Sequence, residues 1–242
     1  IKNSISYFDL DQRSGDIDFS ADQWDSFTEV TLANEINNAS LIFGGNYYTN
    51  SLHVLNERFT VNEESTNTIG IFANGTFDLS EKVILEGGLR IDAVNKDWGQ
   101  FILPRFSVMW KPSNTFSTRL GGGLGYKVPD RFIEGSERYN YQLSQTLEGN
   151  NLKAEKSIGV NWDFNVKGAI GDEVAVSWNQ LFYATSINDA LLIFTSPLDN
   201  GYVLENADGA VLSLGSETNV KFTYGDFRLF LQYAYIDSKL NY

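Results

Sequence analysis

The chain has 242 residues, 42% of them hydrophobic and 14% aromatic, and its 31 acidic and 18 basic side chains give a formal net charge of -13. The apolar content excludes a disordered chain, and the negative charge argues against a nucleic-acid partner because it repels phosphate. The absence of cysteine excludes disulfides, thiolate metal sites and thiol nucleophiles.

Aromatic residues and glycines are abundant. The chain holds 17 phenylalanines, 12 tyrosines, 5 tryptophans and 21 glycines, against 4 prolines and 1 methionine, and aromatic side chains favour strands. No stretch approaches the roughly 18 consecutive apolar residues of a membrane helix. We expect an all-β fold with eleven strands near residues 1–10, 24–34, 39–50, 65–77, 82–95, 99–111, 116–126, 153–167, 173–187, 207–222 and 227–239.

Most of these segments alternate between apolar and polar side chains over ten residues or more. In one of them, Phe116, Leu120 and Leu124 alternate with Ser117 and Arg119. A strand of a soluble sandwich averages about 5–6 residues, whereas a transmembrane strand needs about 9–11. Length therefore favours a transmembrane antiparallel β-barrel over the alternative, a soluble β-fold. Charged residues on the polar side would face the barrel lumen: Glu86, Arg90, Asp92, Arg105, Arg119, Glu217 and Arg228.

Short and long connections alternate along the chain, as they do in outer-membrane barrels. We expect short turns near residues 35–39, 78–81, 111–115, 167–172 and 224–226. We expect wider connections at residues 11–23, 51–64, 127–152 and 188–206, with a short one near 96–99. The strand count is odd, whereas bacterial single-chain barrels close with an even number. The pattern therefore predicts a piece of a larger barrel.

Several stretches in a fixed order resemble the barrel of TonB-dependent outer-membrane receptors, over roughly residues 65–242. They are GGLRID (87–92), ILPRFSVMWKPSNTFSTRLGGGLGYKVPDRF (102–132), NLKAEKS (151–157), INDALLI (187–193), ENADGAVLSLGSE (205–217) and YAYIDSKL (233–240). The resemblance implies an approximately 22-stranded barrel in the bacterial outer membrane, closed by an N-terminal plug. It also implies uptake of a scarce nutrient with energy passed through TonB. We expect residues 1–242 to be a partial barrel, with the plug that mediates the TonB partnership and the last strands outside it.

Two sets of side chains are candidates for function. The lumen charges are expected to pair with one another or with the plug rather than to contact ligand, because charges facing a filled lumen need partners. Rings and cations near the wide connections suit a carboxylate-rich or catecholate ferric chelate. Ordinary girdle and loop composition is an equal alternative. These ligand candidates are Trp98, Tyr126, Lys127, Arg131, Arg138, Tyr139 and Tyr141.

Two further features have plain alternatives. Asp9, Asp11, Asp16 and Asp18 could hold calcium in an outer loop, but their spacing does not match the twelve-residue calcium loop, so a solvated acidic loop is favoured. His53, the single histidine, could bind haem iron, although a lone loop histidine is more often polar surface.

We expect an active outer-membrane receptor for a ferric siderophore. The alternatives are a passive pore or a receptor for cobalamin, haem or oligosaccharide, and an adhesin fits less well. The expected partners are TonB, a small-molecule nutrient and outer-membrane lipid. No nucleophile motif accompanies His53, so neither catalysis nor a cofactor or metal site is expected.

Overall fold

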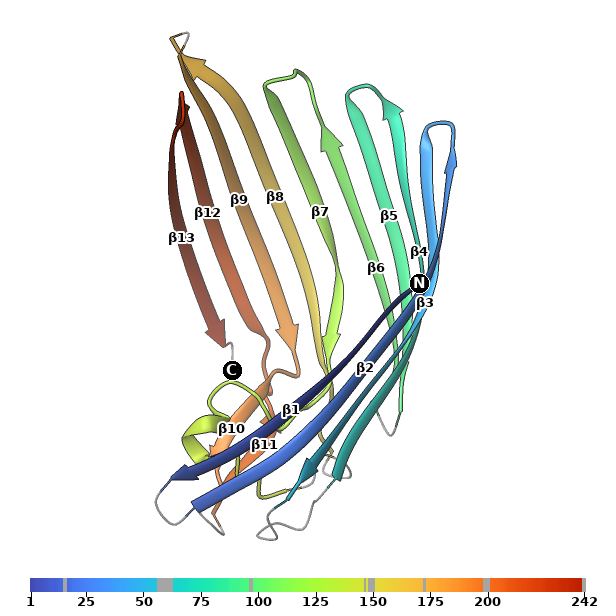
Figure 1. Cartoon of the computed structure of the whole chain (residues 1–242), viewed down its shortest axis with the longest axis vertical. Coiled ribbons are helices and arrows are strands. Elements are labelled where there is room, and N and C mark those ends of the chain that lie inside the picture. Colours follow the sequence, from blue (N-terminus) through green and yellow to red (C-terminus); the bar gives the residue numbers. More distant parts are fainter. Residues whose placement is uncertain are drawn as a thin grey trace.

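The computed structural model describes residues 1–14, 17–55, 63–95, 98–145, 147, 151–171, 173–197 and 201–240. Within these ranges, eleven strands form one antiparallel sheet in chain order, with β12 beside β9 (Figure 1). The predicted all-β, eleven-stranded antiparallel sheet is confirmed, although it is not closed into a barrel here. Its strands are β1 (Lys2–Ser14), β2 (Ile17–Ile36), β3 (Ala39–Val54), β4 (Glu63–Ser80), β5 (Val83–Val94), β6 (Gly99–Trp110), β7 (Phe116–Lys127), β8 (Glu155–Ile170), β9 (Val174–Asn188), β12 (Val211–Tyr224) and β13 (Phe227–Leu240).

The two faces of the sheet carry different side chains. On the face that we call outer, Leu120, Leu124, Ile158 and Val160 are each 44–56% exposed. The opposite, inner face carries the polar and charged residues, because successive side chains of a strand point to opposite faces. Such exposure of large apolar groups over neighbouring strands suits a wall that faces hydrocarbon on one side.

Polar groups on the outer face are paired with one another. The Trp162 Nε1–H donates to Thr118 Oγ1 at 2.9 Å, and the Thr118 hydroxyl donates to the Asp163 carbonyl oxygen at 2.8 Å. Further along, the Thr218 hydroxyl donates to Gln180 Oε1 at 2.6 Å. Hydrocarbon offers no hydrogen-bond partner, so a lipid-facing surface needs its polar groups satisfied internally in this way. Within the described ranges, no helix is both long and apolar enough to cross a membrane.

Five short connections lie at one end of the sheet, and the wide connections lie at the other end together with the β1–β2 and β5–β6 connections (Figure 1). The five short ones join β2 to β3, β4 to β5, β6 to β7, β8 to β9 and β12 to β13, and we call this the turn end. Asn37 and Gly225 in these turns have left-handed φ angles of 47° and 51°, which suit tight hairpins. The wide connections expected after β3, β7 and β9 are present at the other end, which we call the loop end.

The expected wide connection at residues 11–23 is wrong. β1 continues to Ser14 and β2 begins at Ile17, with Leu10 paired to Ala21 across the hairpin. Backbone pairing holds this hairpin together, and the run of polar residues there hides the alternation from the sequence. The strands therefore extend well beyond the length that a bilayer requires.

A second, two-stranded sheet lies at the loop end and was not predicted. β10 (Leu191–Thr195) pairs with β11 (Tyr202–Asn206) inside the connection between β9 and β12. In its described residues, the connection between β7 and β8 contains the 3-10 helix η2 (Ser136–Tyr139). A parallel bridge between Leu143 and Tyr202 joins the two connections.

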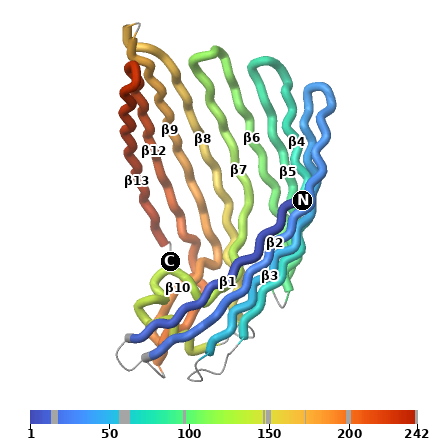
Figure 2. Tube along the Cα trace, in the orientation of Figure 1, coloured from blue at the N-terminus to red at the C-terminus, as the bar shows by residue number. Residues whose placement is uncertain are grey.

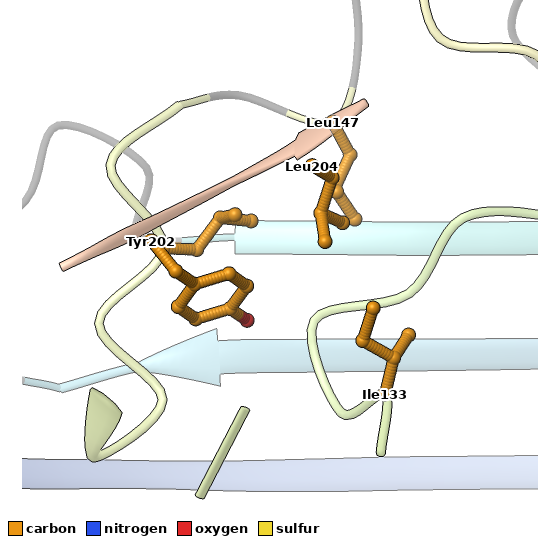
Figure 3. Close-up of a cluster of buried hydrophobic side chains, with 5 residues drawn as sticks. Ile133, Leu147, Tyr202 and Leu204 are labelled. Carbon is orange, nitrogen blue, oxygen red and sulfur yellow. The ribbon is translucent and has the colours of Figure 1, made fainter. Parts of the chain in front are cut away.

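These two connections share a hydrophobic core. We call the described residues of 128–147 and 190–206 the cap. Tyr202 and Leu204 of β11 are 0% and 2% exposed, and they pack with Ile133, Leu143 and Leu147 of the β7–β8 connection (Figure 3). Burial of several large apolar side chains gives the cap a core of its own, separate from the wall.

Candidate functional site

The cap is bound to the inner face of the sheet at the loop end. Phe19 of β2 is 1% exposed and lies 5.5 Å from the Tyr141 ring and 6.3 Å from the Phe132 ring, centroid to centroid. Ala21, Leu52 and Val54 complete this second core. The ends of β1 and β2 run across the cap (Figure 2), and Gln12 Nε2 donates to Asn140 Oδ1 at 3.3 Å.

A buried ion pair joins the cap to β4. The Arg131 guanidinium donates to Glu64 Oε1, and the side chains of Arg131 and Glu64 are only 1% and 12% exposed. The Tyr202 hydroxyl donates to the Arg131 carbonyl oxygen at 2.6 Å, and burial raises the pKa of Tyr202. Arg131, a predicted ligand residue, therefore lies inside the cap with its charge already paired.

A second polar cluster lies below the cap, where β5 and β7 approach. Asp92 is 3% exposed, and its Oδ2 accepts hydrogen bonds from Arg90 Nε and from the Tyr126 hydroxyl, both at 2.9 Å. The Tyr126 ring stacks on Phe101 with centroids 3.8 Å apart and an interplanar angle of 6°. A Cβ at Gly70 would collide with Asp92 Oδ1 and lie 2.7 Å from Arg90 Nη2, so glycine leaves room for the cluster. The cluster thus contains two predicted lumen charges, Arg90 and Asp92, and one predicted ligand residue, Tyr126.

The other predicted lumen charges have fewer contacts. Glu86 accepts a hydrogen bond from the Ser107 hydroxyl at 2.8 Å. In the part of the chain that the structure describes, Arg105 and Arg119 make no ion pair, and the Arg119 guanidinium donates a hydrogen bond to Met109 Sδ at 4.0 Å. Each arginine lines an inner-face hollow, of about 310 Å³ for Arg105 and about 440 Å³ for Arg119. Glu217 and Arg228 also make no ion pair among the described residues. Mutual pairing of the lumen charges is therefore limited to Arg90 and Asp92.

Nearer the turn end, amide side chains on the inner face form a hydrogen-bonded series that the sequence reading missed. Asn219 Nδ2 donates to Asn179 Oδ1 at 3.3 Å, Asn179 Nδ2 donates to Asn165 Oδ1 at 3.0 Å, and Asn165 Nδ2 donates to Asp163 Oδ1 at 2.7 Å. The matching positions of the three asparagines in the alternation of β8, β9 and β12 are the signal that could have identified this series. It gives the lumen wall a polar, ordered surface.

The remaining predicted ligand residues divide into packed and exposed groups. Trp98 packs against the cap core and against the cluster around Phe101, and the Tyr139 hydroxyl lies 3.2 Å from Thr195 Oγ1. Tyr141 packs on Phe19. Lys127 and Arg138 are exposed at the loop end. Most of the predicted rings therefore build the cap or its floor, and these two cations remain available at the surface.

The acidic segment and the histidine lie on strands, not in loops. Asp9 and Asp11 belong to β1 and Asp18 to β2, whereas Asp16 lies outside the described residues. His53 of β3 has Nδ1 3.6 Å from Asp22 Oδ2 and Nε2 3.5 Å from Glu63 Oε1. Among the residues that the structure describes, no group of three or more histidine, cysteine or acidic side chains could hold a metal ion.

Comparisons with known proteins agree on one architecture. The family model described as "TonB dependent receptor-like, beta-barrel" matches residues 2–242. A search of curated proteins found no match.

Several solved structures share the fold at low sequence identity. The siderophore receptor PirA from Pseudomonas aeruginosa has a TM-score of 0.73 at 14% identity, over 92% of this chain and 44% of that one. The FrpB iron transporter from Neisseria meningitidis has a TM-score of 0.71 at 16% identity, over 92% and 36%. The hemophore receptor HasR from Serratia marcescens, solved with its hemophore HasA and heme, has a TM-score of 0.72 at 14% identity, over 97% and 48%. The chain thus spans less than half the length of these proteins.

Proposed function

The chain belongs to the family of TonB-dependent receptor β-barrels. On this basis we propose that the full-length protein is an outer-membrane receptor that imports a scarce, negatively charged metal chelate. The favoured chelate is a ferric siderophore. TonB supplies the energy in this proposal, through a plug domain. The family and the fold are those of transport receptors rather than enzymes.

The cap is the observation that carries the proposal. A passive pore works with an open mouth, whereas here two connections with a shared core lie against the inner face at the loop end. A covered mouth supports a receptor that binds its cargo before passage. Binding residues commonly lie on loops carried by a rigid scaffold, and this arrangement fits that pattern.

The placement of cations supports an anionic cargo. Lys127 and Arg138 are exposed at the loop end, and Arg105 and Arg119 face the lumen without a carboxylate partner among the described residues. The chain as a whole has a net charge of -13, so these unpaired cations are distinct from their surroundings. Carboxylate or catecholate oxygens of a ferric chelate would form charge-assisted hydrogen bonds with them.

Haem is the less favoured cargo. A haem iron needs an axial ligand atom, and both ring nitrogens of His53 lie within 4 Å of carboxylate oxygens. Because both nitrogens already lie beside carboxylates, this arrangement does not favour His53 as an iron ligand.

The proposal is tested by deleting the full-length gene and measuring growth on single iron or cobalamin sources. We expect lost growth on one ferric siderophore, restored by the wild-type gene. Arg105→Gln and Arg119→Gln should each weaken binding of that siderophore to the purified receptor roughly tenfold, the scale of one charge-assisted hydrogen bond. Arg13→Gln, at the exposed tip of β1, is the control and should bind normally. Unchanged growth of the deletion strain on every source would contradict the proposal.

A further inference from the structure

An apolar depression lies on the outer face near the loop end. It has a volume of about 570 Å³ and spans β6, β7, β8, β9 and β12. Its lining includes Pro104, Phe106, Leu124, Ile158, Val160 and Leu212. A hollow of this size in a lipid-facing wall must be filled, because an empty apolar cavity forfeits its packing contacts.

Small residues create the depression. Gly122 pairs with Val160, and Val160 pairs in turn with Ala184, so two positions of this row, Gly122 and Ala184, contribute little side-chain volume. A Cβ at Gly122 would lie 2.8 Å from the Gly159 carbonyl oxygen. Backbone therefore forms the floor of the depression at this point.

The hydrogen-bond ladder between β6 and β7 stops beside the depression. Pairing runs from Trp110 and Thr118 to Arg105 and Gly123, and Pro104 is the next residue. Proline has no N–H to donate to a ladder. Beyond this point the strands pair only with their other neighbours, β5 and β8. Backbone groups that face this seam, which extends to Gly99 and Lys127, need polar partners if lipid surrounds the wall.

A cation lies at the loop-end rim of the depression. Lys156 precedes Ile158 on the outer face by two residues, and it is paired across the sheet with Tyr126 and Asn188. It is exposed, and no ion pair or side-chain hydrogen bond involves it among the described residues. The site therefore combines an apolar hollow, the end of the β6–β7 ladder and an exposed positive charge that makes no ion pair among the described residues.

We propose that this depression holds a lipid of the outer leaflet whose phosphate headgroup carries a net negative charge. An acyl chain fills the hollow, the phosphate contacts Lys156, and polar headgroup atoms meet the backbone groups of the seam. A lipid without net charge would fill the hollow but would leave Lys156 without a counter-charge. The inference rests on the membrane location in the proposed function and is independent of the cargo.

The test is native mass spectrometry of the full-length receptor with a phosphatidylglycerol and a phosphatidylcholine of the same acyl chains as probes. We expect the wild type to retain phosphatidylglycerol preferentially. Lys156→Gln should lower that preference about fivefold, which corresponds to ~1 kcal/mol for one basic residue near a membrane surface. Ala184→Leu should fill the hollow and lower retention of both lipids.

Matched variants serve as controls. Lys82→Gln removes a cation at the turn end, and Ala93→Leu adds the same side chain to the outer face away from the depression; both should bind like wild type. Equal retention of the two lipids by wild type, or no effect of Lys156→Gln, would overturn the lipid site. If siderophore growth persists in that case, only the lipid site is wrong. If the lipid preference holds but no growth defect follows gene deletion, only the uptake proposal is wrong.

Discussion

Two arginines of the same connection show how burial separates structure from function. Arg131 is 1% exposed and paired with Glu64, whereas Arg138 lies on the surface at the end of η2. Both are cations among aromatic residues, and their local sequence does not distinguish them. The difference comes from Glu64, which is distant in sequence and pairs with Arg131, so that the Arg131 charge holds the cap in place.

Replacing these two arginines should change two different properties, the stability of the cap and the binding of the chelate. Arg131→Ala leaves Glu64 buried without its guanidinium, and losing one partner of a buried pair costs about 3–5 kcal/mol. We expect the amides of residues 131–143 to exchange hydrogen much faster in the full-length receptor. Arg138→Ala should leave that exchange unchanged and weaken binding of the anionic chelate. Equal protection in Arg131→Ala and wild type would contradict the anchoring role.

The strands of the main sheet were predictable because apolar and polar side chains alternate along each strand, one kind on each face. The sequence reading missed β10 and β11 because these five-residue strands are too short for alternation to distinguish. It also ended β1 at residue 10, where polar residues such as Asp11 and Gln12 continue the strand. Glu64 lies 67 residues from Arg131, and Gln12 lies 128 residues from Asn140. No local sequence pattern indicates such contacts. The sequence therefore singled out the aromatic and cationic residues of the cap but did not predict that they would pack and pair within it.

Paired strands also constrain glycines, as the inner face of β9 and β12 shows. The Tyr183 ring lies over Gly215, where a Cβ would collide with it, whereas a Cβ at Gly87 of β5 would meet nothing within 4 Å. Gly215→Val should displace the ring and cost about 1–3 kcal/mol. Gly87→Val should be neutral or stabilising, because valine favours strands. Urea unfolding of the full-length receptor compares the two; equal effects would contradict the ring contact.

At the scale of the whole sheet, the two faces carry different kinds of side chain. Leu120 is 46% exposed on the outer face, and Ser117 of the same strand lies on the inner face. The family to which the chain belongs forms barrels of this kind, and the mutual pairing of Thr118 with Trp162 on the outer face fits a hydrocarbon environment.

A single charge placed on either face tests this organisation. Leu120→Lys should destabilise the full-length receptor in lipid vesicles by about 2–4 kcal/mol, as expected for lysine near the bilayer midplane. Ser117→Lys places the same charge in the wet lumen and should cost much less. Reversible unfolding in denaturant gives both values. A larger loss for Ser117→Lys would mean that the faces are assigned the wrong way round.

The cap also implies an order of maturation. Its parts come from distant stretches of chain: Arg131 meets Tyr202, 71 residues later, and Glu64, 67 residues earlier. Bringing residues together across such long stretches of chain costs conformational entropy. The contacts of the cap can offset this cost only after the sheet has aligned the strands that carry them. The cap should therefore form last. Before it forms, a newly inserted molecule would expose the chain segments of the cap to an external protease, and the fully folded receptor would resist that protease.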